Sequence, residues 1–393
     1  MAYRYRLQPT PEQEAILREH CAHARFVWNL GTEQRLEYRP GRGPTPGFVE
    51  QCRQLTEARA AEPWLAAGSA NVQQQALRDL DQAWQNFFAG THCRPDWRKK
   101  DQHEGFRITN FIFVLHIQRI NRQWGQVKIP KIGWVRFRWS RTVLECKSYR
   151  VTRDRADRWH ISFAAIPDPV PAPGNGMVVG IDRGVAVSAA LSTGELLTIP
   201  RLSPGRSQRL IRLQRRLSRA KRGSNRRGKV KFAIARLKAR EADTRKDWTE
   251  KLSTDVARRF DVIKVEDLRV ASMTRSTRGT VEEPGKNVRQ KAGLNRGILR
   301  SGWGLLVRRL EHKAPGRVEK IKPAYTSQRC SACGHVDRES RESQARFRCT
   351  ACGFADNADV NAARNIAAGH AVTARGGDGV ARPVNREPLV GAA

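Results

Sequence analysis

The sequence predicts an α/β protein of several domains that binds polyanions. At 393 residues the chain has room for two or three domains. Helical patterns fill the first quarter of the chain, alternating strand patterns follow, and a second region of strands and helices begins after a proline-rich segment. Lysine and arginine number 73 against 38 acids, which gives a formal net charge of +35. Such an excess is typical of proteins that neutralise phosphate backbones.

The N-terminal region is expected to be helical after one short strand at residues 3–7. Residues 10–13 read Thr-Pro-Glu-Gln, a capping sequence with a hydroxyl at the cap and glutamine three positions later. A second helix is expected from Val72 to Phe88, where apolar residues recur at helical spacing up to Gly90. We expect most aromatic residues of these helices to pack in the core, and a minority to contact nucleobases.

Residues 106–163 are expected to form antiparallel strands. Alternating apolar and polar residues mark four of them, at 127–129, 134–139, 148–152 and 159–163. These strands predict a small sheet or barrel with basic residues on its outer side. Residues 167–176 are rich in proline and glycine, which predicts a domain boundary there.

A second set of short strands opens the C-terminal half. The apolar run Val178–Asp182 predicts a buried strand, and strands at 185–191 and 196–199 follow it in hairpin order, which predicts a mixed sheet. Further elements are expected at 252–260 (helix), 262–266 (strand) and 294–313 (helix).

Residues 201–240 contain sixteen lysines and arginines and no acid. Apolar residues recur at helical spacing through this segment, which favours a basic helical hairpin, broken at Gly223 and Gly228, over a disordered tail. The cations expected to contact nucleic acid are Arg209, Arg212, Arg215, Arg216, Arg219, Lys221, Arg222, Arg226, Arg227 and Lys229.

Three acids are candidates for metal-dependent chemistry. Asp182 and Glu266 each end an apolar strand, and Asp359 lies at the start of an alanine-rich helix. Converging carboxylates bind magnesium, and two ions about 4 Å apart can stabilise the attacking and leaving oxygens of a phosphodiester. Each acid alone could equally cap a helix or form an ion pair, so only the three together favour a site.

Four cysteines form a CxxC pair repeated at zinc-ribbon spacing: Cys330, Cys333, Cys349 and Cys352. Four thiolates close a tetrahedral site, so one bound zinc ion would be structural. The other four cysteines are scattered, which favours reduced thiols over a disulfide framework. The sequence contains no GxxxxGK[ST] phosphate loop, no HExxH zinc helix and no GxSxG nucleophile elbow.

The sequence has no run of roughly 18 apolar residues and no apolar segment at its start that would resemble a signal peptide. We therefore expect a cytoplasmic, nucleoid-associated protein with no membrane partner and no small-molecule cofactor.

The chain resembles the TnpB (OrfB) family of transposon-encoded proteins, thought ancestral to the type V CRISPR effectors. The resemblance covers nearly the whole chain and rests on the motifs Arg25–Asn29, Ala83–Phe88, Ile129–Val135, Gly180–Gly184, Val265–Leu268, Tyr325–Gly334 and Ala358–Ile366. It implies a wedge β-barrel with an inserted helical recognition lobe, then a RuvC-like nuclease of RNase H fold with an inserted zinc ribbon.

By this resemblance the wedge barrel comprises residues 1–9 and 105–170. A helical lobe at 10–104, helix-turn-helix-like in its N-terminal region, interrupts the barrel. A linker at 171–176 leads to the nuclease at 177–324, which resumes at 355–372 after the zinc ribbon at 325–354. Residues 373–393 are expected to form a flexible tail.

The resemblance also implies RNA-guided cleavage of double-stranded DNA beside a short adjacent motif, with a transposon-derived guide RNA and two magnesium ions. Asp182, Glu266 and Asp359 match the family's catalytic acids. Asp359 is preferred to Asp356, and the arginine common before this acid is Ala358 here. A nuclease-inactive RNA-guided regulator and a compact type V CRISPR effector stay open, whereas a single-strand transposase is disfavoured because its paired histidines and catalytic tyrosine are lacking.

Overall fold

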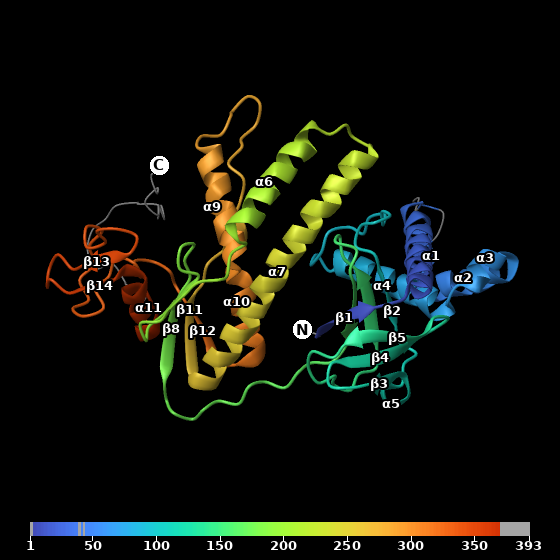
Figure 1. Ribbon diagram of the computed structural model, residues 1–393, viewed down its shortest axis with the longest axis horizontal. Coiled ribbons are helices and arrows are strands. Elements are labelled where there is room, and N and C mark those ends of the chain that lie inside the picture. The colour runs from blue at the N-terminus through green and yellow to red at the C-terminus, as the bar shows by residue number, and fades with distance from the viewer. Residues whose placement is uncertain (1–2, 38–40, 42–43, 370–393) are drawn as a thin grey trace. The chain divides into compact units, whose positions relative to one another are not determined.

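The computed structural model describes residues 3–37, 41 and 44–369, so the tail expected at 373–393 lies outside the described residues. The chain divides into two compact units (Figure 1). The first comprises Met1–Pro167 and Leu210–Ala239, and the second comprises Asp168–Arg209 and Arg240–Ala393. Within the described ranges, no helix combines the length and the apolar character needed to cross a membrane.

A seven-stranded antiparallel sheet forms the core of the first unit. Its strands are β1 (Arg4–Gln8), β2 (Gly105–Ile108), β3 (Ile117–Arg119), β4 (Trp124–Ile129), β5 (Gly133–Arg138), β6 (Tyr149–Arg153) and β7 (Trp159–Phe163), in the order β2-β6-β7-β1-β5-β4-β3. β1 is central, because its first residues pair with β7 and its last two with β5. The predicted alternation is confirmed in β5, where Val135 and Phe137 are buried while Arg136 and Arg138 are exposed.

The closed barrel that the resemblance implied is not found in the described residues. The two edge strands, β2 and β3, do not pair with each other, and the sheet stays open. These strands are four and three residues long. A barrel closes only where strand tilt and register let its edges meet, and such short edges offer few ladder bonds for closure.

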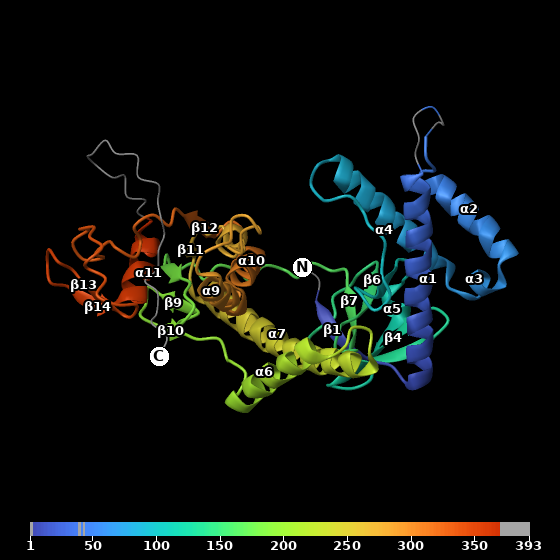
Figure 2. The same ribbon diagram turned by 90° about the horizontal axis from the view of Figure 1, so that it is seen from above.

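Helices cover the β2 end of this sheet. They are α1 (Pro11–Leu36), α2 (Phe48–Ala61), α3 (Pro63–Ala67) and α4 (Ala70–Phe88), with a short α5 (Phe113–His116) before β3. α1 packs against α4, and α4 contacts both α2 and β2 (Figure 2). The predicted cap of α1 is confirmed: the Gln13 N–H donates to Thr10 Oγ1 (3.3 Å) and the Thr10 N–H donates to Gln13 Oε1 (3.1 Å).

The second unit contains a five-stranded mixed sheet, which confirms the prediction. Its strands are β8 (Val178–Asp182), β9 (Ala189–Leu191), β10 (Leu196–Leu197), β11 (Val262–Glu266) and β12 (Val318–Ile321), in the order β10-β9-β8-β11-β12. β8, β11 and β12 run parallel, whereas β9 and β10 are antiparallel to their neighbours. The register pairs Val265 with Ile181, so Asp182 and Glu266 are the next residues along the two strands.

The remaining elements are α6 (Pro204–Arg219), α7 (Asn225–Arg259), α8 (Val270–Met273), α9 (Val288–Ser301), α10 (Trp303–Lys313), β13 (Arg346–Arg348), β14 (Ala355–Asn357) and α11 (Ala358–Ala368). α6 and α7 form the predicted hairpin, which the two units share (Figure 1). β13 and β14 pair with each other in the cysteine-rich segment.

Two helix predictions are wrong. The hairpin turns at Gly223, where φ is +81°, but the break expected at Gly228 is absent, because α7 continues through that residue to Arg259; the helix expected at 252–260 is present as the last part of α7. A glycine inside a helix costs only about 1 kcal/mol, so one glycine does not stop a helix of this length. Conversely, the single helix expected at 294–313 is two helices, because Gly302 adopts a left-handed conformation (φ 70°) between α9 and α10.

α11 lies unusually close to β8, the strand that carries Asp182. A Cβ atom added to Gly180 would lie 2.0 Å from the carbonyl oxygen of Ala363 and 2.4 Å from the backbone nitrogen of Ala367. Small buried residues on the helix, Ala362 and Ala363 among them, make the same approach possible from the other side. Glycine at position 180 is therefore what allows helix and strand to meet backbone to backbone.

We expect Gly180→Ala to destabilise the second unit by about 3 kcal/mol, because backbone atoms of α11 cannot move aside as a side chain could. Urea unfolding followed by circular dichroism measures the change. Gly304→Ala in α10 is the matched control, since a Cβ there meets nothing within 4 Å. Equal stability of the two variants would contradict this account of the packing.

Candidate active site

The second unit brings the three predicted acids to one edge of its sheet. Parallel pairing of β8 and β11 places Asp182 and Glu266 side by side at the carboxyl ends of adjacent strands. Asp359 comes from the first turn of α11, which packs on β8 and also contacts β11. The side chain of Asn357 caps this helix by accepting from the backbone N–H groups of Asp359 (3.0 Å) and Val360 (3.3 Å).

The three carboxyl groups lie close enough for their charges to interact. Burial raises the pKa of Asp182 well above its usual value, and the negative charges of Glu266 and Asp359 raise it further. Like charges disfavour ionisation of a shared site unless a cation balances them. The arrangement is therefore unfavourable for three free carboxylates and suited to divalent cations.

Glu266 is oriented by neighbours on both sides. Thr326 Oγ1 donates a hydrogen bond to Glu266 Oε1 at 2.6 Å. The guanidinium of Arg183 donates to the backbone carbonyl oxygen of Glu266, and Arg183 is only 4% exposed. Burial lowers the pKa of Arg183, while the charges of Glu266 and Asp182 oppose that effect. Neither Thr326 nor Arg183 was predicted to have a role, although each lies inside a motif on which the resemblance rests.

Asp359 is paired with an arginine that the sequence analysis also missed. Arg341 Nη2 lies 3.2 Å from Asp359 Oδ1. Burial raises the pKa of Asp359, and Arg341 lowers it through charge and hydrogen bonding. The two residues are 18 positions apart, so the sequence around Ala358 alone could not reveal this cation. Asp356, the alternative candidate, is instead ion-paired with Arg364 (2.7 Å).

The four predicted zinc ligands meet in space. Cys330, Cys333, Cys349 and Cys352 have Sγ atoms that all lie within 4.8 Å of one another. Cys330 and Cys352 are 3.8 Å apart, and Cys333 and Cys349 are 3.5 Å apart. Zinc–sulfur bonds of about 2.3 Å in a tetrahedron require sulfur atoms about 3.8 Å apart. The cluster can therefore hold one structural metal ion such as zinc.

The backbone around these cysteines has the turns that such a site needs. Gly334 and Gly353, which follow the two CxxC pairs, both have positive φ, at 78° and 73°. Burial raises the pKa of the Cys349 thiol, but backbone N–H groups of Cys352 and Ala351 oppose this and bring it to about 6. The four scattered cysteines are free thiols, as predicted.

Asparagines of α11 join the metal cluster to the acids. Asn361 is fully buried; its Nδ2 donates to the Arg329 carbonyl oxygen (2.8 Å) and its Oδ1 accepts from the Ser331 N–H (2.9 Å). Asn365 Nδ2 donates to the carbonyl oxygens of Thr326 (3.0 Å) and Arg329 (2.7 Å). The chain from Thr326 to Ser331 is thus fixed on α11, the helix that carries Asp359 in its first turn.

Among the residues that the structure describes, only the four cysteines bring three or more candidate ligand atoms within 4.8 Å. The three carboxylates are therefore grouped without converging on a single point.

The basic hairpin presents most of its predicted contacts to solvent. Nine of the ten residues are exposed: Arg209, Arg212, Arg215, Arg216, Arg219, Lys221, Arg222, Arg226 and Lys229. Arg227 is different, because its Nη1 donates to the carbonyl oxygens of Leu217 (2.7 Å) and Ala220 (2.9 Å). Its guanidinium closes the turn between α6 and α7, which is a structural role.

Three family descriptions match parts of the chain. They are "Helix-turn-helix domain" over residues 1–43, "Probable transposase" (OrfB) over 160–277 and "Cas12f1-like, TNB domain" over 303–366. The last range contains the four cysteines and Asp359. In the described part of 1–43 the elements are β1 and one continuous helix, α1.

Relatives match over the full length. The chain is 36% identical over 395 residues to "Putative RNA-guided DNA endonuclease InsQ" of Escherichia coli (strain K12), covering 98% of this chain and 97% of the relative. It is 32% identical over 401 residues to "Putative RNA-guided DNA endonuclease" of Streptomyces pristinaespiralis, covering 99% and 94%.

The fold is similar to that in "Cryo-EM structure of the Cas12f1-sgRNA-target DNA complex", with a TM-score of 0.51, 15% identity and coverage of 91% of this chain and 83% of that chain. These matches define a mixed α/β protein of Cas12f1-like fold. The chain belongs to the TnpB (OrfB) family.

We expect Asp182→Asn to raise the thermal midpoint of the metal-free protein by about 2–4 °C at pH 7.5. A carboxyl whose folded-state pKa is raised stabilises the fold only at low pH, and that contribution is lost as pH rises through the raised pKa. Near pH 4 the difference between the proteins should vanish. Scanning calorimetry at both values measures it, with Asp255→Asn, an exposed acid on α7, as control. A midpoint that stays unchanged at pH 7.5 would contradict the inferred repulsion.

We expect one zinc ion per chain, and its loss in Cys330→Ser. Cobalt substitution should give the thiolate charge-transfer absorption of a four-sulfur site, absent from that variant. Cys93→Ser, which changes an exposed cysteine elsewhere, should keep the metal.

Because Asn361 and Asn365 of α11 bind the segment from Thr326 to Ser331, which includes Cys330, metal removal should also expose α11 to hydrogen exchange. Full protection of α11 without metal would argue against this coupling.

Proposed function

We propose that this protein is an RNA-guided DNA endonuclease whose single nuclease site comprises Asp182, Glu266 and Asp359. The observation that carries the proposal is the grouping of these carboxylates at one sheet edge, where two of them raise the pKa of the third. The relatives named as RNA-guided DNA endonucleases over the full chain support the substrate and the guide. On this view the second unit is a RuvC-like nuclease carrying a zinc ribbon.

The residues of the site fit two magnesium ions. Carboxylate oxygens are preferred magnesium ligands, and the site groups three carboxylates, two of which end adjacent parallel strands. Such ions would supply charge stabilisation for the attacking and leaving oxygens of a DNA phosphodiester. Thr326 donates a hydrogen bond to Oε1 of Glu266, and this bond fixes the orientation of the whole carboxylate group.

Arg341 has a positioning role in this proposal. Its guanidinium holds Asp359 and opposes the rise in the pKa of that acid. Arg341 therefore favours the ionised, metal-binding form of Asp359 and limits the rise in its pKa that burial causes. Because the arginine comes from the zinc ribbon, the ribbon takes part in ordering the nuclease site.

The guide RNA and the target DNA would lie on the basic surfaces. The exposed cations of the α6–α7 hairpin and the outward arginines of β5 suit a nucleic-acid backbone, which is bound through phosphates without a code for each base. Base pairing with a transposon-derived RNA would then select the sequence, next to a short adjacent motif. The wedge and recognition-lobe roles of the first unit, with the boundaries implied by the resemblance, belong to this proposal.

We expect the protein, co-expressed with the non-coding sequence that flanks it, to copurify with a discrete RNA and to cut double-stranded DNA matching that guide. Cleavage should require magnesium and fall at least a thousandfold in Asp182→Ala and Asp359→Ala. Asp356→Ala is the matched control and should cut normally, because its partner is Arg364. RNA-dependent binding without cutting would identify a guided regulator instead, and random RNA with no guided cuts would reject both.

We expect Arg341→Ala to shift the acidic limb of the cleavage pH profile to higher pH, with about tenfold slower cleavage near pH 6. Without the guanidinium, burial alone acts on Asp359 and raises its pKa further. Single-turnover rates from pH 5.5 to 9 measure the shift, and Arg341→Lys should restore part of it. Arg338→Ala, an exposed neighbour in the ribbon, is the control. A limb that stays in place would assign Arg341 a purely structural role.

A further inference from the structure

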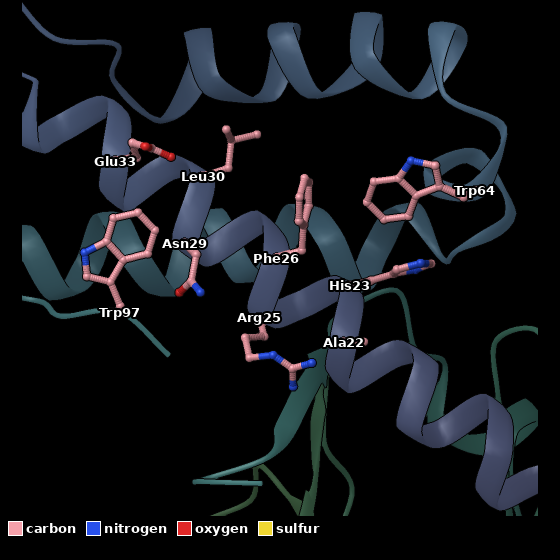
Figure 3. A pocket seen from close by; sticks show the side chains of 9 residues that line it. All are labelled: Ala22, His23, Arg25, Phe26, Asn29, Leu30, Glu33, Trp64 and Trp97. Carbon is pink, nitrogen blue, oxygen red and sulfur yellow. The ribbon is translucent and has the colours of Figure 1, made fainter. Parts of the chain in front are cut away.

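The first unit contains an aromatic groove that the proposed nuclease site does not use. It encloses about 580 Å³ between α1, α3 and the segment after α4. Figure 3 shows Trp64 and Trp97 at its two ends, with Phe26, Leu30 and Asn29 of α1 between them. Glu33 lies beside Leu30, near the Trp97 end.

The apolar side chains of the groove are exposed. The exposed fractions are 43% for Phe26, 39% for Leu30, 45% for Trp64 and 41% for Trp97. Large apolar side chains gathered in one exposed patch usually mark a binding surface. Phe26, which faces the groove, therefore belongs to the minority of aromatic residues that were not expected in the core.

The ring of Trp97 is presented by a fixed backbone. Asn29 Nδ2 donates to the Arg98 carbonyl oxygen (3.1 Å) and Asn29 Oδ1 accepts from the Arg98 N–H (2.7 Å). Trp28 Nε1 donates to the Asp96 carbonyl oxygen (3.0 Å). The residues on both sides of Trp97 are held on α1, while its own ring stays exposed. This segment contains no helix or strand that would otherwise order it.

Trp64 is held as firmly at the other end. Its ring meets Phe26 edge to face, with centroids 4.9 Å apart and planes at 84°. Arg59 Nη1 donates to the carbonyl oxygens of Leu65 (2.8 Å) and Gly68 (3.2 Å), which closes α3 behind the ring. Hydrogen bonds therefore hold the backbone beside both tryptophans, so binding a ligand would require little ordering of the protein backbone.

The charges around the groove favour an anionic backbone outside it. Residues 94–100 carry three exposed cations, Arg94, Lys99 and Lys100, whereas the guanidinium of Arg98 packs over the Trp28 ring, 3.6 Å from its centroid. The one acid, Asp96, accepts a hydrogen bond from the Trp97 N–H (2.7 Å). Glu33 is exposed at the groove, where it repels phosphate and can accept a hydrogen bond from an exocyclic amino group. A nucleotide would thus enter base first, with its phosphate towards the cations.

We propose that this groove binds unpaired bases of the RNA that the protein carries, by stacking on Trp64 and Trp97. The inference rests on the proposed function, because it names a contact of the guide RNA. A duplex keeps its bases stacked inside, so only unpaired nucleotides can reach the rings. RNA is the occupant that fits best, because selective RNA recognition combines splayed bases on aromatic rings with hydrogen bonds to base edges. The groove supplies both.

Fluorescence anisotropy of the full chain, freed of nucleic acid, tests the proposal with a 15-nucleotide unstructured RNA. The same sequence as DNA and an RNA duplex form the other arms. Raised salt weakens binding through phosphates, so base stacking then accounts for a larger share of the measured affinity. We expect Trp64→Ala and Trp97→Ala each to weaken RNA binding about 5- to 100-fold, and Trp97→Phe to stay within about threefold. Phe88→Ala, a 72% exposed aromatic of α4 outside the groove, should bind like the wild type.

Ultraviolet crosslinking of the wild-type complex should attach a nucleotide to the peptides that contain Trp64 or Trp97, which needs no folded variant. Unchanged RNA binding by both alanine variants, with no crosslink there, would overturn the inference. Weaker DNA binding with RNA binding intact would overturn the assignment to RNA. A change of oligomeric state alone would make the groove a contact between copies of the chain. A wild type that binds no RNA at all would instead overturn the proposed function.

Discussion

The acid cluster depends on the close approach of α11 to β8. Gly180 has no side chain, so the backbone of the helix rests on the backbone of the strand. Asp359, in the first turn of α11, then lies beside the ends of β8 and β11, where the parallel register places Asp182 next to Glu266. A side chain at position 180 would move the third acid away from the other two.

The same helix connects the cysteine cluster to this edge. Asn361 and Asn365 bind the backbone from Thr326 to Ser331, and Thr326 in turn donates to Glu266. Arg341, from the same ribbon, holds Asp359. The metal site of the ribbon, the helix and two strands therefore form one assembly that positions three carboxylates. The close carboxylates repel one another electrostatically, and such repulsion is retained in a protein where a bound cation or a reaction needs the acids together.

Strong local signals made much of this architecture predictable. The capping sequence of α1, the apolar runs of β8 and β11, and the CxxC pairs each act within a few residues, and the structure contains all of them. Elements without such a signal were missed. α2 buries only Gln51 and Leu55, too few for an apolar stripe. Gly228 and Gly302 look alike in the sequence, but only Gly302 takes a left-handed conformation, which depends on how the flanking helices pack.

Within the site, the three acids and their order along the chain could be predicted from the sequence, whereas the side chains that contact them could not. Arg341 reaches Asp359 only after the ribbon folds, and Arg183 reaches Glu266 across two strands that are far apart in sequence. The aromatic stripe of α1 was expected mainly in the core, because helical spacing does not tell a buried face from a groove that α3 and the segment after α4 leave open.

Two catalytic ions bound by Asp182, Glu266 and Asp359 would lie about 4 Å apart and would be magnetically coupled when manganese(II) replaces magnesium. Electron paramagnetic resonance should therefore detect two coupled ions per chain, and the coupled signal should be lost in Asp182→Asn. A single uncoupled ion, or binding that this variant leaves unchanged, would rule out the two-ion site.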